Sequence, residues 1–468
     1  MRLSLGEIVQ YLALEPEALF GEISDVTITQ AAYDSREIPE DALFVAIKGD
    51  RTDGHNFVQA AVKNGAKAIL AERYTENVAI PQLIVQDSVK ALGQIAHYVR
   101  KKTKATVIGV TGTSGKTTVK EALANVFRQA GKTLVTPRNL NTQIGLPISI
   151  LGSSGDEKYW VLECGISHPK DMDELGAILE PDIALILNVG PGHTQGLGDL
   201  GVAWHKTRLL THLAEGGQAV VSGDYPELVW KAIGTHIERL NFFSIKPGVA
   251  GTSSYLGEYL GEGSEGYSRY KISLPKSQFE VEAPFRGIYG AENCIAVAAV
   301  ASLLNIPNDL IIQGLHTLKL PAQRFNQYQL KNWRIIDDTY NANPLSMERM
   351  LQASKREGED FVVVLGEMRE LGSQAESLHK ELGQLLAQIK PKAIFWKGGL
   401  GESVQKGLSQ EGATIPLIFL TEPQDFRQQL QEANISQDSS GTIIFKGSRA
   451  NALERYVDEF KQMLAAKD

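Results

Sequence analysis

Residues 105–131 read ATVIGVTGTSGKTTVKEALANVFRQAG, and their pattern decides the fold at the centre of the chain. The apolar run 105–110 predicts a buried strand, and residues 119–131 have the spacing of an amphipathic helix that ends at a glycine. Between them lies TGTSGKTT, a glycine-containing loop with Lys-Thr, which between a strand and a helix is typical of a phosphate-binding loop. Backbone N–H groups and the positive end of the helix are then expected to face the phosphates.

The loop is a shortened form of the usual pattern, because Val110 occupies the first glycine position and Gly109 falls one residue early. In the remaining T-G-x-x-G-K-T form, Lys116 is predicted to reach the terminal phosphates and the Thr117 hydroxyl to hold Mg²⁺. A glycine-rich turn that binds nothing is the alternative, which the flanking strand and helix disfavour. The predicted ATP contacts of the loop are Gly112, Thr113, Ser114, Gly115, Lys116, Thr117 and Thr118.

Two more apolar runs, KYWVLECG (158–165) and PDIALILNVG (181–190), predict further strands. Apolar strands separated by helices indicate a parallel sheet covered on both faces. Glu163 ends the first run, and His193 follows the second across a short loop. Ligands bind at the carboxyl ends of such strands, so both side chains are expected near the Mg²⁺ at Thr117. A carboxylate suits this hard cation better than an imidazole does.

The strand and helix patterns divide the chain into three α/β blocks, residues 1–84, 85–318 and 319–468. The predicted fold class is therefore α/β with a small N-terminal domain, a central phosphate-loop domain with a parallel sheet, and a C-terminal doubly wound, Rossmann-like domain. The glycine- and serine-rich segment 248–268 is expected to form exposed turns or a hairpin insertion.

The composition narrows the class of partner. The chain has 468 residues, a net charge of -8 and no apolar run long enough to span a membrane. An acidic balance argues against nucleic acid or an anionic membrane surface as the main partner. The only two cysteines, Cys164 and Cys294, stand in apolar surroundings and are expected to be buried free thiols. We expect a cytoplasmic protein with access to ATP.

Lys206 lies in GVAWHKTRLL (201–210). An ammonium group has no acceptor atom and repels a metal ion, so taken alone Lys206 is predicted to be a solvated lysine on a helix. It could join the metal site only as a carbamate formed with CO₂, which would turn the cation into an anionic oxygen ligand.

A series of motifs across all three blocks resembles the Mur ligases, and among them the MurF type. The motifs are YDSREIPEDALFVAIKGDRTDGH, TGTSGKTTVKE, TPRNLNTQIGLPISIL, VLECGIS, NVGPGH, IIDDTYNANPLSM, VVLGEMRELG and KGSRA. The resemblance implies an ATP-dependent amide ligase of peptidoglycan precursor synthesis, which adds D-alanyl-D-alanine to a UDP-N-acetylmuramoyl tripeptide through an acyl phosphate. It further implies ATP and two Mg²⁺ ions as cofactors, small-molecule substrates and a monomeric enzyme.

The resemblance also implies residue roles. It assigns the UDP sugar to Asp34, Ser35 and Arg36, which without that context form a turn or a helix cap. It assigns the two magnesium ions to Thr117, Glu163, His193 and a carbamylated Lys206. It places other residues at or beside the nucleotide, namely Asn293, Arg324, Asp338, Asn341 and Asn343. For the C-terminal motif it implies no specific role; the motif residues are Lys446, Ser448 and Arg449.

The chain departs from the family pattern in several places. Tyr289 and Gly290 stand where the family has His and Asn, Arg208 stands where it has an acidic residue after the lysine, and Gln195 replaces another acidic residue. Glycine cannot supply an amide contact to adenine. Two alternatives therefore stay open: a divergent ligase with another acceptor or nucleotide, or a phosphate-loop kinase or ATPase.

Overall fold

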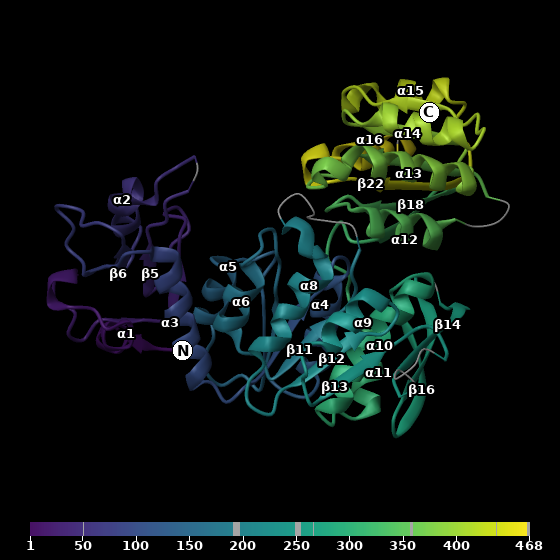
Figure 1. The fold of residues 1–468 in the computed structure, drawn as a ribbon. Coiled ribbons are helices and arrows are strands. Elements are labelled where there is room, and N and C mark those ends of the chain that lie inside the picture. Colours follow the sequence, from purple (N-terminus) through teal and green to yellow (C-terminus); the bar gives the residue numbers. More distant parts are fainter. Residues whose placement is uncertain are drawn as a thin grey trace.

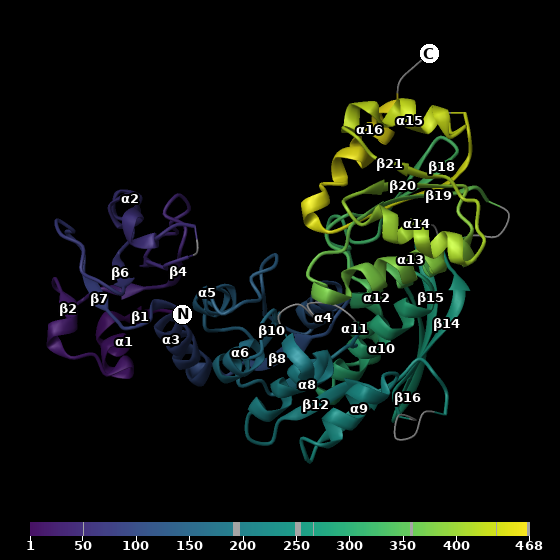
Figure 2. The same cartoon turned by 45° about the horizontal axis from the view of Figure 1, so that its top comes forward.

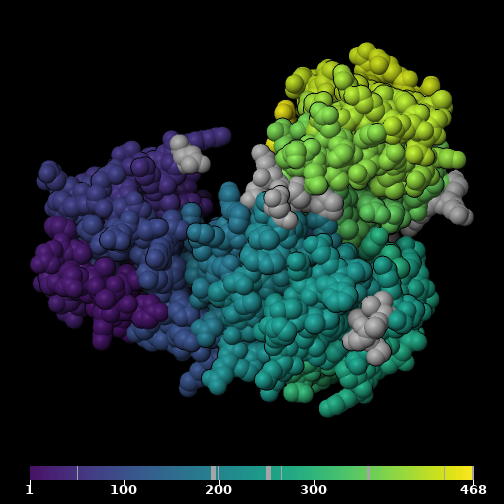
Figure 3. Space-filling view, in the orientation of Figure 1, coloured from purple at the N-terminus to yellow at the C-terminus, as the bar shows by residue number. Residues whose placement is uncertain are grey.

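The computed structural model describes residues 1–49, 51–190, 197–248, 254–264, 266–355, 359–436 and 438–465. In this part of the chain the strands gather into three regions, an N-terminal, a central and a C-terminal one (Figure 1). The space-filling view shows the N-terminal and C-terminal regions standing apart on the central one, with an open gap between them (Figure 3). The predicted domain boundaries at residues 84/85 and 318/319 fall between the sheets of neighbouring regions.

The N-terminal region is built on a sheet with the order β2-β7-β6-β5-β4, parallel except for β2. Ser4 and Glu7 cap the first helix reciprocally, so that this helix begins where the sequence turns amphipathic. The elements are β1 (Leu3–Ser4), α1 (Leu5–Leu12), β2 (Leu19–Phe20), β3 (Thr27–Ile28), β4 (Gln30–Ala32), β5 (Ala42–Val45), α2 (Val58–Lys63), β6 (Ala68–Ala71), β7 (Gln82–Ile84) and the connecting helix α3 (Ser88–Lys102).

The central region holds a parallel sheet with the order β13-β12-β11-β8-β10-β9. After β8 the chain places β9 and β10 on one side and then crosses to β11 on the other, which is the switch point where parallel sheets bind ligands. The elements of this sheet and its helices are β8 (Thr106–Thr111), α4 (Lys116–Arg128), β9 (Thr133–Val135), α5 (Gly145–Leu151), β10 (Tyr159–Glu163), α6 (Asp171–Leu179), β11 (Ile183–Ile186), α8 (Gly201–Thr207), β12 (Gln218–Ser222), α9 (Pro226–Ile233), β13 (Leu240–Phe243), α10 (Gly287–Leu303) and α11 (Asn308–His316).

A second, antiparallel sheet of the central region runs in the order β14-β15-β16, with bounds Leu256–Glu262, Ser268–Leu274 and Ser277–Ala283. The glycine-rich segment 248–268 thus forms a hairpin rather than exposed turns, as far as it lies in the described residues. One face of this hairpin is buried against α10, because Tyr270 and Ile272 belong to the same apolar cluster as Ala291 and Ile295.

The C-terminal region has a sheet in the order β17-β18-β22-β19-β20-β21, with β17 antiparallel at its edge. The polar edge strand β17 was not predicted, because NQYQL carries little apolar pattern. Helices α12, α13 and α14 cover one face, and α15 and α16 the other. The elements are β17 (Asn326–Leu330), β18 (Trp333–Asp338), α12 (Pro344–Ser354), β19 (Phe361–Gly366), α13 (Ala375–Ile389), β20 (Ala393–Lys397), α14 (Gly401–Gln410), β21 (Leu417–Phe419), α15 (Phe426–Glu432), β22 (Gly441–Lys446) and α16 (Glu454–Ala465).

Helix α12 lies on the side of the C-terminal region that faces the central region, in both orientations of the ribbon (Figures 1 and 2). No helix in the described part of the chain combines the length and the apolar composition needed to cross a bilayer.

Candidate active site

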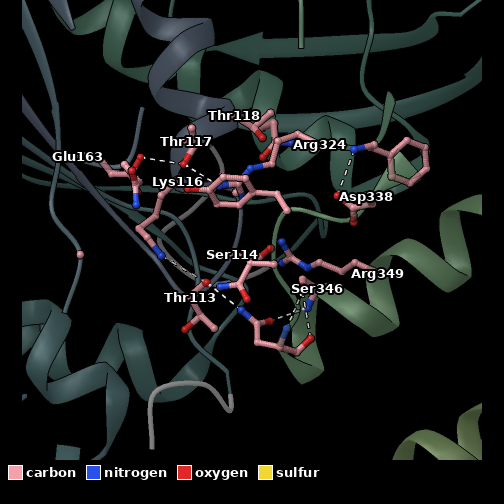
Figure 4. A pocket seen from close by; sticks show the side chains of 18 of the residues that line it. Thr113, Ser114, Lys116, Thr117, Thr118, Glu163, Arg324, Asp338, Ser346 and Arg349 are labelled. Carbon is pink, nitrogen blue, oxygen red and sulfur yellow. Dashed lines mark hydrogen bonds between the residues drawn. The ribbon is translucent and has the colours of Figure 1, made fainter. Parts of the chain in front are cut away.

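A cavity of about 570 Å³ lies between the central and C-terminal regions. It opens at the carboxyl ends of β8 and β10, where the switch point of the sheet predicts a ligand. Its walls come from the phosphate loop, the end of β10, the first turn of α10 and the segment 320–353. Figure 4 shows side chains from both regions converging on this space.

The phosphate loop has the backbone that its sequence predicts. Gly115, at the start of α4, has a φ of 80°, a conformation that glycine adopts without strain. The segment just after β11 holds the loop in shape, because the N–H of Thr113 donates to the Asn188 carbonyl at 3.0 Å and the N–H of Ser114 to the Asn188 Oδ1 at 2.8 Å. The loop is therefore preorganised at a helix N-terminus, the usual place for phosphates.

Lys116 is the cation of this loop. Its Nζ donates to the carbonyl oxygen of Gly112 at 2.8 Å. Burial lowers the pKa of the Lys116 ammonium, an effect that the charge of Glu163 opposes. A half-buried cation bound mainly to its own loop is ready to exchange a carbonyl partner for a phosphate oxygen, which is anionic and binds it more strongly.

Thr117 and Glu163 meet at the edge of the sheet, as their positions after β8 and at the end of β10 predict. The Thr117 hydroxyl donates to Glu163 Oε2 at 2.9 Å, and Asn141 Nδ2 donates to Glu163 Oε1 at 2.8 Å (Figure 4). The Glu163 residue is 2% exposed. Hydroxyl and carboxylate oxygens at this spacing fit the preference of Mg²⁺ for hard oxygen ligands.

The remaining predicted metal ligands are His193 and Lys206. His193 lies outside the described residues. Within the described ranges no cluster of three or more His, Cys, Asp or Glu side chains is arranged to hold a metal ion. The oxygens of Thr117 and Glu163 are therefore the part of the predicted metal site that the structure brings together.

Lys206 is not the solvated lysine that its sequence context alone predicts. It lies on α8 and is 1% exposed. Burial lowers the pKa of its ammonium well below the usual value, and the nearby charge of Lys116 lowers it further, whereas Glu163 opposes the shift. A lysine in this environment is readily deprotonated, and the free amine is the nucleophilic form.

The C-terminal region reaches into the cavity with Arg324, as predicted. Its Nη2 donates to the Thr117 hydroxyl at 3.2 Å, and its guanidinium lies 3.9 Å from the centre of the Tyr340 ring. Asn343 Nδ2 also crosses between the regions and donates to the Thr113 carbonyl at 3.2 Å. Arg324 and Asn343, the N-cap of α12, thus contact the phosphate loop from the C-terminal region.

Asp338 and Lys446 line the cavity as a pair, with Oδ2 and Nζ 2.5 Å apart. Lys446 also donates to the Asn341 carbonyl at 3.0 Å. Ser448 lies elsewhere: its hydroxyl donates to the Glu367 carbonyl and accepts the N–H of Arg369. Of the C-terminal motif, only Lys446 is therefore a wall of the cavity, while Ser448 holds a loop together.

Gly290 is required by packing. A Cβ at this position would stand 2.0 Å from the Tyr270 hydroxyl oxygen, which β15 places beneath the first turn of α10. The family pattern has an asparagine at this position. Its side chain would collide with Tyr270, so the packing of the hairpin explains the glycine. Asn293, one turn along, packs against the phosphate loop, since its Oδ1 would lie 3.3 Å from a Cβ at Gly115.

Other predicted residues lie away from the cavity. Arg36 pairs with Asp34 at 2.6 Å in the loop after β4, and neither these two residues nor Ser35 lines the cavity. The N-terminal region that carries them lies beside the central region and apart from the C-terminal region (Figure 1). Arg208 pairs with Asp173 at 2.7 Å, so its departure from the family pattern serves an ion pair on the surface of the central region.

Several residues of the site were not predicted: Asn141, Tyr340 and Arg349 line the cavity, and Asn188 holds the phosphate loop. Asn141 and Asn188 belong to quoted motifs, and their polar side chains at strand or loop ends were the available signal. Arg349 had no such signal, because it lies within a helix whose cavity-facing side is defined only by the packing of two regions.

Comparison with known proteins agrees with this geometry. Three Mur ligase profiles match: the family's catalytic domain over residues 27–100, the middle domain over 110–301 and the glutamate ligase domain over 323–457. The UDP-N-acetylmuramoyl-tripeptide–D-alanyl-D-alanine ligase of Escherichia coli is 31% identical over 94% of this chain and 96% of its own. The ligase of the same name from Bacillus subtilis is 30% identical over 97% of each chain.

Solved structures give the same result. A crystal structure of MurF from Acinetobacter baumannii superposes with a TM-score of 0.87 at 28% identity and covers 99% of both chains. MurF ligase from Thermotoga maritima in complex with ADP superposes with a TM-score of 0.80 at 31% identity, over 93% of this chain and 98% of that one. The chain therefore belongs to the Mur ligase family.

Proposed function

We propose that the protein is an ATP-dependent ligase of peptidoglycan precursor synthesis that joins D-alanyl-D-alanine to a UDP-N-acetylmuramoyl tripeptide and releases ADP and phosphate. The observation that carries this proposal is the corner where Lys116, Thr117 and Glu163 meet at the sheet edge, opposite Arg324 of the C-terminal region. Relatives named for this reaction match nearly the whole chain, so the likeness extends beyond the phosphate loop.

The chemistry needs an activated acid, because a carboxylate and an amine do not condense at neutral pH. Transfer of the terminal phosphoryl group of ATP to the carboxylate forms an acyl phosphate, which the amine attacks as phosphate leaves. Lys116 and Arg324 stand on opposite sides of the phosphate loop and stabilise the charge of the transferring group. The contact of both regions with this loop excludes water that would hydrolyse the acyl phosphate.

Mg²⁺ fits the hydroxyl of Thr117 and the carboxylate of Glu163, which we assign to it together with His193 and a carbamylated Lys206 as a two-ion site. When bound, magnesium supplies charge neutralisation to the phosphates. The buried position and depressed pKa of Lys206 support the carbamate, since only the neutral amine reacts with CO₂. Asn141 holds the second oxygen of Glu163 and so keeps the first one turned toward Thr117.

We assign the UDP sugar to Asp34, Ser35 and Arg36 in a domain of residues 1–84, and ATP to a domain of residues 85–318. The domain of residues 319–468 then completes the nucleotide site. Arg36 is suited to a diphosphate because its side chain is 85% exposed; its Nε and Nη2 bind Asp34, so the diphosphate would meet the remaining N–H groups of the guanidinium. The substrate is long, so its nucleotide can lie on the N-terminal region while the reacting carboxylate reaches the cleft. We further propose a monomer that works in the cytoplasm, where ATP is present.

The decisive experiment supplies purified protein with UDP-N-acetylmuramoyl tripeptide, D-alanyl-D-alanine and Mg-ATP. We expect ADP, phosphate and the pentapeptide product, with phosphate released only when both substrates are present. A stable phosphorylated product formed from one substrate alone would indicate a kinase instead. A panel of other amines, scored by phosphate release, tests the acceptor; a clear preference for another amine would replace D-alanyl-D-alanine in the proposal.

A further inference from the structure

Arg349 joins the C-terminal region to the central region through a buried ion pair. It lies on α12, and its Nη1 is 2.6 Å from Oε2 of Glu292 on α10, with the two side chains 9% and 1% exposed. Tyr225, which precedes α9, donates its hydroxyl to Glu292 Oε1 at 3.2 Å and accepts a hydrogen bond from Arg349 Nη2. These three side chains, here called the buried triangle, come from segments that are far apart in the sequence.

The buried triangle also fixes the position of an aromatic wall of the cavity. The guanidinium of Arg349 lies 4.5 Å from the centre of the Tyr289 ring. The Tyr289 hydroxyl donates to Gln352 Oε1 at 3.0 Å, one turn further along α12. Tyr289 and Arg349 both line the cavity, beside the apolar Met350 and Ala353. This end of the cavity offers ring and aliphatic surfaces, which suit a nucleobase.

The same helix reaches the phosphate loop at its other end. Asn343 caps α12 by accepting the N–H of Ser346 at 2.8 Å, and it donates its side-chain amide to Thr113 of the loop. Arg349 is less than two turns further along the helix. Because a short helix moves as a rigid body, the ion pair at Arg349 also determines where Asn343 meets the loop.

The cost of this arrangement argues for a positional role. Two buried charges lose their hydration, and a well-packed apolar pair would hold two regions together as firmly. What the ion pair adds is direction, because the planar guanidinium meets two partners at once, Glu292 through Nη1 and Tyr225 through Nη2. Burial raises the pKa of Glu292, and the guanidinium beside it opposes this shift, so the two side chains depend on each other.

We propose that Glu292 and Arg349 are positioning residues for the nucleotide, which lock α12 and the Tyr289 ring against α10. The base end of the cleft is then formed wherever the two regions meet as they do in this structure. This inference rests on the proposed function only in taking the cavity as the nucleotide site. The two residues act through Tyr289 and α12, and they are not catalytic.

The test is titration of the purified full-length variants Glu292→Gln and Arg349→Met with ADP, followed by steady-state kinetics. We expect the Kd for ADP and the KM for ATP to rise about tenfold, the change that loss of a strong coupling between contacting residues produces. The kcat should stay within about twofold, and the KM for the UDP-linked substrate should not change. Arg349→Lys keeps the charge but not the planar fork, so its Kd should lie between those of the wild type and Arg349→Met.

Two controls separate position from folding. The double variant Glu292→Met/Arg349→Met removes both buried charges, so it should fold and still bind ADP weakly. Lys392→Met breaks an exposed ion pair with Asp360 in the same region and should bind ADP like the wild type. Folded variants that bind ADP within twofold of the wild type would overturn this inference alone. A wild-type protein that binds no ADP would overturn the proposed function as well.

Discussion

The two ends of the cleft are built in different ways. At the phosphate end, Lys116 and Thr117 are consecutive in the sequence, and Glu163 is the last residue of a neighbouring strand. At the base end, Glu292 and Arg349 are brought together only by the packing of two regions. The phosphate end uses backbone N–H groups and a helix terminus, which a short motif specifies. The base end uses side chains whose partners depend on how the regions meet.

The largest effect that this comparison predicts is at Lys206, beside the phosphate end. Lys206→Ala should abolish turnover, because the carbamate proposed to complete the metal site is lost. ADP binding should persist, since the loop contacts remain. Short carboxylic acids should restore part of the activity by taking the place of the carbamate. Activity is measured as phosphate release, with Lys231→Ala, an exposed lysine on α9, as the matched control. Wild-type rates in Lys206→Ala would show that the carbamate is not needed.

The next effect concerns the cation of the phosphate loop. Lys116→Ala should lower kcat by about 10³-fold, the loss seen when a preorganised group that stabilises transition-state charge is removed. The free energy of unfolding should change little, because the lysine bonds mainly to carbonyls of its own loop, which water can satisfy. Rate measurements at saturating substrates test this prediction. If the loss appeared in KM alone, Lys116 would bind the ground state and transition state equally.

At the base end the expected effect is on stability. An alanine at most helix positions is more stable than a glycine by roughly 0.5–1 kcal/mol. Gly290→Ala should instead destabilise the fold by about 1–3 kcal/mol, because its methyl group overlaps the Tyr270 hydroxyl oxygen. Tyr270→Phe removes that oxygen, so the double variant should recover part of the loss. Denaturant unfolding measures all three proteins, and an unchanged stability of Gly290→Ala would contradict the packing argument.

The smallest predicted effect concerns Arg36, which lies outside the cleft. It tests whether the uridine nucleotide is bound by the N-terminal region or by the cleft. Arg36→Ala should raise the KM for the UDP-linked substrate about tenfold, as expected for the loss of one charge-assisted contact. The KM for ATP should stay unchanged, because Arg36 does not line the cavity. Lys63→Ala, an exposed lysine on α2, is the control. An equal rise in both KM values would mean that Arg36 supports the fold rather than the substrate.

Residue patterns were reliable where chemistry is local. They predicted the loop, the helix after it and the meeting of Thr117 with Glu163, because parallel strands end at a common edge of the sheet. They were wrong about Lys206 when its context was taken alone, because a lysine in a helix of only 7 residues carries no sign of what will cover it. They treated Gly290 as a lost contact, although the reason for the glycine lies in a strand of the hairpin, twenty residues earlier in the sequence.

The sequence by itself determined the α/β class, the phosphate end of the cleft and the family, since each depends on short runs of residues and their order. The tertiary structure alone decided the burial of Lys206 beside the phosphate end and, at the base end, the packing of Gly290 on Tyr270 and the pairing of Glu292 with Arg349. Burial and partner choice are properties of surfaces that meet only after the regions have folded. A local pattern specifies backbone conformation and spacing, and it contains no information about which distant side chain will occupy the space above it.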